Sequence, residues 1–193
     1  MFVTFYFFYF SLFNHTKKMD NKKIILVSRF PQVPEALKIL YDNFEVRVNE
    51  GEPYSKIKFK KAIRDIEGLI CSGKDIIDDE LMKYAPKLKI ISIPGAGYNN
   101  IDIEAAKRRG IAVTNTPDVL TETVADFTFG LILAVSRRIT EANDILKSRK
   151  PLKWSGFYLP ANDVYHKTLG LVGFGRIGKA VAQRAVGFKM KII

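Results

Sequence analysis

The chain has 193 residues, of which 47% are hydrophobic and 26% charged, and its formal net charge is +11. This composition is typical of a folded globular protein and excludes a disordered chain. A single cysteine, Cys71, excludes an internal disulfide framework and a cysteine-based zinc site and favours a reducing, cytoplasmic location. The two histidines, His15 and His166, leave little material for a metal centre or a catalytic dyad, so we expect no metal.

The first eighteen residues differ in character from the rest of the chain. Residues 1–13 are almost wholly apolar and include eight aromatic residues. This run is shorter than the roughly 20 residues of a membrane-spanning helix, and the basic start and cleavage site of a signal peptide are missing. We expect residues 1–18 to be an extension outside the fold, produced by an upstream translation start, and we expect no membrane partner. A short membrane-surface tail is the alternative.

Short apolar runs alternate with amphipathic runs from residue 23 to residue 115. Continuous or alternating apolar residues predict strands, and apolar residues at helical spacing predict helices. The predicted strands are 24–28, 44–48, 68–72, 89–93 and 111–115, and the predicted helices are 34–42, 54–65, 77–85 and 103–110. Gly110 is expected just beyond the end of the last of these helices. The alternation predicts a parallel sheet with helices on both faces, which is an α/β domain of flavodoxin-like type over residues 19–115.

One long helix is predicted over residues 121–147, with Thr121 as its N-cap. It is apolar around much of its circumference, which predicts burial between domains or in an oligomer interface. Residues 148–166 contain two prolines and predict an extended connector.

A glycine-rich motif follows this connector. Leu169, Leu171 and Val172 predict a strand, residues 177–188 predict a helix, and residues 189–193 predict the start of a second strand. Between strand and helix stands G-x-G-x-x-G, formed by Gly173, Phe174, Gly175, Arg176, Ile177 and Gly178. In this context the first glycine permits a tight turn, the second lets backbone N–H groups approach a pyrophosphate, and the third permits close packing. The motif predicts the beginning of a Rossmann dinucleotide-binding domain.

A second glycine-containing loop follows the predicted strand 89–93. Ligands of open parallel sheets bind at the carboxyl ends of strands, and the N–H groups of Ala96 and Gly97 could form a nest for a carboxylate there. An ordinary glycine turn in which Asp102 caps the next helix explains the same residues equally well.

Three segments together resemble the D-isomer-specific 2-hydroxyacid dehydrogenase family, and within it the glyoxylate/hydroxypyruvate reductases. They are GAGYNNID (95–102), NTPDVLTETVAD (115–126) and DVYHKTLGLVGFGRIGKAVAQRA (163–185). The resemblance implies a substrate domain and a Rossmann domain, NAD or NADP as cofactor, a small 2-oxo or 2-hydroxy acid as substrate, and a homodimer. It implies that the amides of Ala96 and Gly97 bind the substrate carboxylate and that residues 173–178 hold the cofactor pyrophosphate.

The resemblance also implies that catalytic residues are missing. The Arg, Glu and His of the family lie beyond residue 193, so we expect a C-terminally truncated chain in which residues 116–193 form the first part of the nucleotide domain. We expect this chain to be inactive as an NAD(P)-dependent oxidoreductase. A non-enzymatic, corepressor-like dinucleotide-binding relative and a decayed gene product remain alternatives.

Nucleic-acid binding is a more distant alternative. Ten of the 31 Lys and Arg residues lie in residues 147–193, where Asp163 is the single acidic residue. No nucleic-acid-binding motif accompanies this charge, so we expect no nucleic-acid partner.

Overall fold

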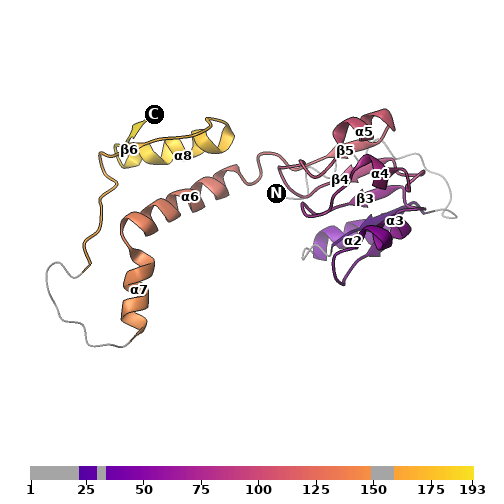
Figure 1. Cartoon of the computed structure of the whole chain (residues 1–193), viewed down its shortest axis with the longest axis horizontal. Coiled ribbons are helices and arrows are strands. Elements are labelled where there is room, and N and C mark those ends of the chain that lie inside the picture. The colour runs from indigo at the N-terminus through magenta and orange to yellow at the C-terminus, as the bar shows by residue number, and fades with distance from the viewer. Residues whose placement is uncertain (1–21, 30–33, 149–158) are drawn as a thin grey trace. The chain divides into compact units, whose positions relative to one another are not determined.

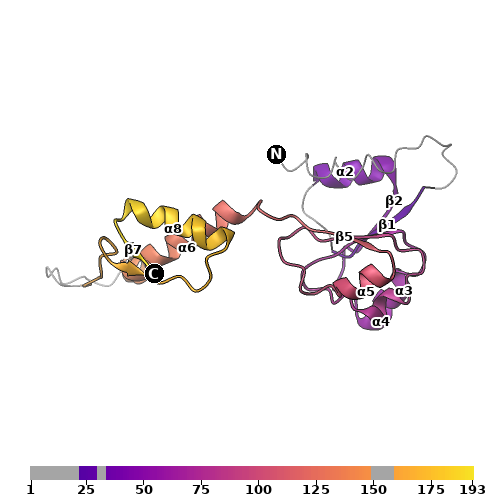
Figure 2. The ribbon, with the colours of Figure 1, turned by 90° about the horizontal axis from the view of Figure 1, so that it is seen from above.

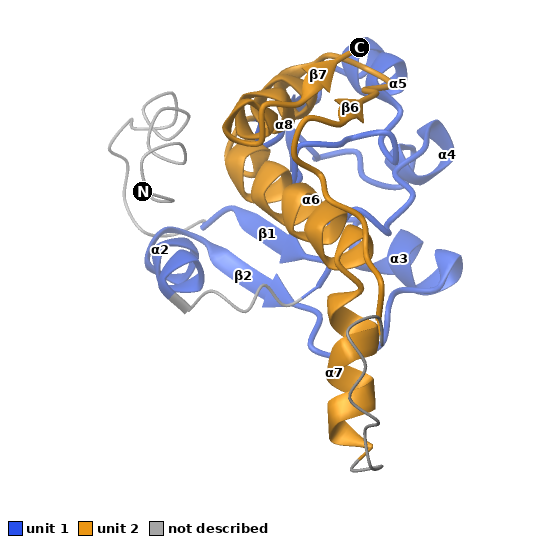
Figure 3. Ribbon diagram, turned by 90° about the vertical axis from the view of Figure 1, so that its left-hand side faces the viewer, with its two compact units in different colours: residues 1–117 blue, residues 118–193 orange. Residues whose placement is uncertain are grey.

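The computed structural model describes residues 22–29, 34–148 and 159–193, so the prediction for residues 1–18 lies outside the described residues. The chain divides into two compact units, residues 1–117 and residues 118–193, which are coloured separately in Figure 3.

A five-stranded parallel sheet forms the centre of the first unit (Figure 1). Its strands pair in the order β2-β1-β3-β4-β5, which is the flavodoxin-like order, so the predicted fold is confirmed. They are β1 (Ile24–Val27), β2 (Glu45–Val48), β3 (Gly68–Ile70), β4 (Ile90–Ser92) and β5 (Ala112–Thr114). Because all five strands run in parallel, their carboxyl ends share one edge of the sheet.

Helices lie on both faces of this sheet, as Figure 2 shows. One face carries α2 (Pro34–Asn43), whose Leu37 and Leu40 pack on Val27. The other face carries α3 (Lys56–Ala62), α4 (Asp79–Met82) and α5 (Ile103–Arg108). The main apolar core lies on this second side, where side chains of the three helices pack on Leu26, Leu69 and Ile91.

Polar caps set the helix ends that the apolar pattern leaves open. Ser55, Asp78 and Asp102 each accept a hydrogen bond from a backbone N–H in the first turn of α3, α4 and α5. Helices α3 and α4 therefore begin two residues later than the predicted segments 54–65 and 77–85, whereas α5 begins at Ile103 as predicted. Gly110 follows α5 with a φ of 68°, which confirms its predicted position after the helix.

The second unit is built around two packed helices. It contains α6 (Thr121–Ser136), α7 (Ile139–Lys147), β6 (Thr168–Leu169), α8 (Arg176–Gly187) and β7 (Lys191–Ile192). Ala125 and Phe129 of α6 pack on Ala180, Val181 and Ala185 of α8. Strands β6 and β7 pair in parallel, so the predicted order of strand, glycine motif, helix and second strand is confirmed.

The prediction of one helix over residues 121–147 is wrong, because α6 ends at Ser136 and α7 begins at Ile139. Arg138 has a φ of 54°, in the left-handed region, where a right-handed helix cannot continue. The N–H of Asn162 donates to the carbonyl of Ser136 at 2.9 Å, and Arg138 Nη1 donates to the carbonyl of Pro160 at 3.1 Å. A later segment thus fixes the break.

One further detail of α6 differs from the prediction. Thr121 is the first helical residue rather than the N-cap, a position that Leu120 occupies without a side-chain hydrogen bond. Phe127, Leu131 and Val135 are exposed on α6, so its apolar circumference is not covered within its own unit, as expected for a helix that packs in an interface. No helix in the described ranges is long and apolar enough to cross a membrane.

Candidate functional site

The loop after β4 presents unused backbone donors at the carboxyl edge of the sheet. Asn115 Nδ2 donates to the carbonyl of Ala96 at 2.8 Å, and the N–H of Thr116 donates to the carbonyl of Gly95 at 2.9 Å. Ala96 and Gly97 are exposed residues, and their N–H groups donate to no group in the described part of the chain. The carbonyls of this loop are therefore anchored while two consecutive donors stay available for an anion.

A polar cluster lies beside this loop, and the sequence analysis did not find it. Asp75 is buried, and its Oδ2 accepts hydrogen bonds from the hydroxyl of Ser28 and from the N–H of Ser72 at 2.7 Å. Asn100 Nδ2 donates to the carbonyls of Asp75 at 2.7 Å and of Ser72 at 3.2 Å. The turn-forming sequence Ser-Gly-Lys-Asp at residues 72–75 was the available signal.

The glycine motif of the second unit has the geometry that its pattern predicts at two of its three glycines. Gly173 has a φ of 96°, a conformation that favours glycine. A Cβ at Gly178 would stand 2.5 Å from the carbonyl oxygen of Gly173, so only glycine allows this approach of helix and turn. A Cβ at Gly175 would meet no atom within 4 Å, which leaves that side of the turn open.

The amino end of α8 is exposed and carries free donors. The first backbone hydrogen bond of the helix runs from the N–H of Lys179 to the carbonyl of Gly175 at 2.9 Å, and the N–H groups of Arg176 and Ile177 have no acceptor in the described ranges. These donors and the helix dipole attract an anion. Arg176 lies beside them, and its Nε is 2.7 Å from Oδ1 of Asp118. The motif therefore fits a dinucleotide pyrophosphate.

The described residues contain one histidine, which lies away from these donors, and one cysteine, which is buried and unreactive. His166 is exposed, and its N–H donates to the carbonyl of Phe188 at the carboxyl end of α8. The glycine motif lies at the other end of α8, a helix of twelve residues and therefore about 18 Å in length. Cys71 is buried, and burial, with a smaller contribution from the charge of Asp75, raises the pKa of its thiol to about 12. No group of His, Cys, Asp or Glu among the described residues could hold a metal ion.

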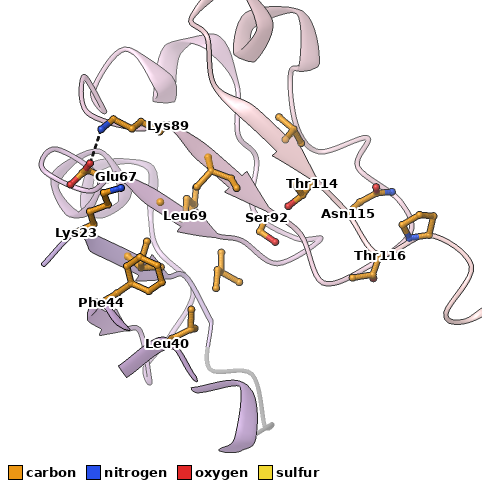
Figure 4. A pocket seen from close by; sticks show the side chains of 16 residues that line it. Lys23, Leu40, Phe44, Glu67, Leu69, Lys89, Ser92, Thr114, Asn115 and Thr116 are labelled. Atoms are coloured by element: carbon orange, nitrogen blue, oxygen red, sulfur yellow. Dashed lines mark hydrogen bonds and ion pairs between the residues drawn. The ribbon is translucent and has the colours of Figure 1, made fainter. Parts of the chain in front are cut away.

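An apolar groove of about 420 Å³ lies on the face of the sheet that carries α2 (Figure 4). Leu40 and Phe44 line one side, and Ser92 and Thr114 line the other. The few charged groups around it include Glu67 and Lys89, which form an ion pair at 2.9 Å. The lining is mostly apolar, and the hydroxyl groups of Ser92, Thr114 and Thr116 are its uncharged polar groups besides Asn115.

Comparison with known protein families finds one matching model. The catalytic-domain model of the D-isomer specific 2-hydroxyacid dehydrogenases matches residues 24–188. A glyoxylate reductase of Thermococcus kodakarensis is 43% identical over 177 residues, which make up 89% of this chain and 52% of that protein. The chain thus spans about half the length of the curated relatives it matches.

Solved structures of 2-hydroxyacid dehydrogenases and related reductases are also similar to this chain. An NADPH-dependent glyoxylate/hydroxypyruvate reductase of Sinorhizobium meliloti, in complex with NADP and malonate, is 35% identical with a TM-score of 0.72, over 89% of this chain and 52% of that one. A D-lactate dehydrogenase of Aquifex aeolicus, complexed with NAD and lactic acid, is 30% identical with a TM-score of 0.70, over 88% and 50%.

Proposed function

This chain belongs to the D-isomer specific 2-hydroxyacid dehydrogenase family, and we propose that it carries two anion subsites of an NAD(P)H-dependent reductase of small 2-oxo acids. Glyoxylate and hydroxypyruvate are the proposed substrates. The supporting observation is that backbone N–H groups of exposed residues have no partner among the described residues at two places, Ala96 and Gly97 and the amino end of α8. The similarity to two glyoxylate reductases, of Thermococcus kodakarensis and Sinorhizobium meliloti, supports the same substrate class.

The substrate carboxylate binds at the loop after β4 in this proposal. Two consecutive N–H groups, at Ala96 and Gly97, donate to its oxygens, while Asn115 holds the loop from the side of β5. No cationic side chain is required in that unit for this contact, because backbone amides in a nest already carry partial positive charge.

The cofactor pyrophosphate binds at Gly173, Phe174, Gly175, Arg176, Ile177 and Gly178. Gly178 brings the helix against the turn, the amides at the start of α8 donate to the phosphate oxygens, and Arg176 adds a positive charge beside them. Bound NAD(P)H would supply the hydride for the reduction. Relatives complexed with NADP and with NAD support either nucleotide.

Domain roles, assembly and location complete the proposal. Residues 19–115 form the substrate domain, and residues 116–193 form the first part of the nucleotide domain. The exposed apolar face of α6 supports assembly as a homodimer, and the single buried thiol supports a reducing, cytoplasmic compartment.

We further propose that this chain binds its ligands without turnover. The described residues of the first unit contain no histidine, and His166 lies at the opposite end of α8 from the glycine motif. Loss of a positioned general acid costs roughly 10²–10⁴ in rate. A corepressor-like role is not favoured, since the relatives reported above are named as reductases and dehydrogenases.

Equilibrium dialysis of the full chain against NADH and NADPH tests the proposal. We expect binding of at least one nucleotide and its loss in Gly178→Ala, whose Cβ would collide with the Gly173 carbonyl. Gly187→Ala, at the other end of the same helix, meets no atom within 4 Å and serves as the control. Absence of binding to both nucleotides, or equal binding by the two variants, would contradict the pyrophosphate subsite.

A further inference from the structure

Asp75 is a buried carboxylate with no ion-pair partner among the described residues, and the residue as a whole is 7% exposed. Its Oδ2 accepts from the Ser28 hydroxyl and the Ser72 N–H, and both of these donors are neutral. Burying a charge destabilises the fold unless hydrogen bonds compensate it. A buried carboxylate at this position therefore suggests a role other than packing.

The carboxylate fixes the turn that follows β3. It draws the Ser72 N–H toward Ser28, which follows β1, and the N–H of Asp75 itself donates to the Ser72 carbonyl at 3.1 Å. The turn is thereby tied to the neighbouring strand at the carboxyl edge of the sheet. Residues 72–75 thus have a single defined position relative to β1.

The same turn fixes the segment that leads out of the Ala96–Gly97 loop. Asn100 donates from Nδ2 to two carbonyls of the turn, and its own carbonyl accepts from the N–H of Ile77 at 2.8 Å. Asn115 holds the opposite side of the loop through Ala96. The loop is therefore held from both sides, and the Asp75 cluster supplies the side toward β3.

We propose that Asp75 is a positioning residue for the carboxylate of the 2-oxo acid, acting through the 72–75 turn and Asn100 on the amides of Ala96 and Gly97. This inference rests on the proposed function. Holding the two N–H groups in place before the ligand arrives removes the cost of ordering the loop on binding. Asp75 acts by hydrogen bonding, because its negative charge taken alone would repel a carboxylate.

Loss of the Asp75 charge should weaken glyoxylate binding if Asp75 acts by hydrogen bonding, and should strengthen it if Asp75 acts only by charge repulsion. The test is an NMR titration of the ¹⁵N-labelled full chain with sodium glyoxylate, with sodium chloride at equal ionic strength as the reference. The chemical shifts of the Ala96 and Gly97 amides are the readout. Asp75→Asn removes the charge and keeps the size, and Ser28→Ala removes one donor and leaves the charge. We expect each variant to raise the glyoxylate dissociation constant about fivefold, the scale of one weakened hydrogen bond to a charged group.

Asp78→Asn is the matched control, since it makes the same exchange three residues away. Asp78 caps α4 through the N–H of Leu81, and asparagine caps a helix equally well. We expect the control to bind glyoxylate like the unmodified chain. Adding Asn100→Ala to Asp75→Asn should weaken binding by less than the product of the single effects, because both residues act through one turn.

The outcomes separate the two proposals. If the unmodified chain shows no glyoxylate-dependent shift at Ala96 and Gly97, the proposed function and this inference are both overturned. If the chain binds while Asp75→Asn and Ser28→Ala bind equally well, the inference alone is overturned. Tighter binding by Asp75→Asn would also overturn it, because Asp75 would then act as a repelling charge. If Asp75→Asn does not fold, Ser28→Ala decides by the same criterion.

Discussion

The three glycines of the dinucleotide motif differ in what restricts them to glycine. Backbone conformation restricts Gly173, and a carbonyl 2.5 Å from the missing Cβ restricts Gly178. Gly175 is restricted by neither in the structure, which leaves room for the pyrophosphate that we propose binds there. The sequence pattern predicted the roles of Gly173 and Gly178 because they follow from local geometry. The Asp75 cluster could not be predicted, since Ser28, Asp75 and Asn100 meet only in the folded sheet.

Asp118 is predicted to compete with the pyrophosphate for Arg176. Their side chains form an exposed ion pair at 2.7 Å, and Asp118 has a φ of 69°, which asparagine also tolerates. Asp118→Asn should lower the dissociation constant for NADPH about twofold at low salt, and added salt should remove the effect. Asp163→Asn, which breaks the exposed pair with Arg137, is the control in the same dialysis assay. If Asp163→Asn lowers the dissociation constant for NADPH to the same extent, the effect comes from net charge and not from the pair with Arg176.

Cys71 is predicted to be unreactive in the folded chain. Burial raises the pKa of its thiol to about 12, so the thiolate that attacks disulfides is scarce at pH 8. A disulfide reagent such as dithionitrobenzoate should react after unfolding and not before. Because the folded pKa is the higher one, this group stabilises the fold fully below about pH 8.5, the pKa of an unfolded thiol, and loses that contribution as the pH rises toward 12. Rapid reaction of native protein would contradict the burial.

At the scale of elements, the sheet of the first unit and the order of elements around the glycine motif followed from apolar periodicity. The break between α6 and α7 did not, because residues 160–163 contact it from far along the chain. Arg137 pairs with Asp163 at 2.6 Å, and Arg138 donates to the carbonyl of Pro160. Periodicity describes one segment at a time and carries no information on such contacts.

The exposed face of α6 is predicted to drive self-association. Phe127, Leu131 and Val135 are spaced by four residues, so they lie on one face of the helix, and they are 66%, 50% and 78% exposed. Sedimentation should show the chain associating at micromolar concentration, and Leu131→Lys should shift it toward monomer. Ile57→Lys, at a position 71% exposed on α3, is the control and should leave association unchanged. A monomeric unmodified chain would contradict this prediction.

At the scale of the molecule, we propose one anion subsite in each of the two units. The first presents the Ala96 and Gly97 amides at the carboxyl edge of its sheet, and the second presents the amino end of α8 with Arg176. The family resemblance predicted these positions from the sequence. That their N–H groups have no acceptor among the described residues could be seen only in the structure. In this proposal the ligands are bound through backbone N–H groups more than through charged side chains.

The carboxylate subsite is tested most directly by the glyoxylate titration of the ¹⁵N-labelled, unmodified chain. The account predicts saturable shifts at the amides of Ala96 and Gly97, with no comparable shift at Gly110, an exposed glycine at the end of α5 in the same unit. Shifts that are absent at the loop, or equal at Gly110 and at the loop, would contradict it.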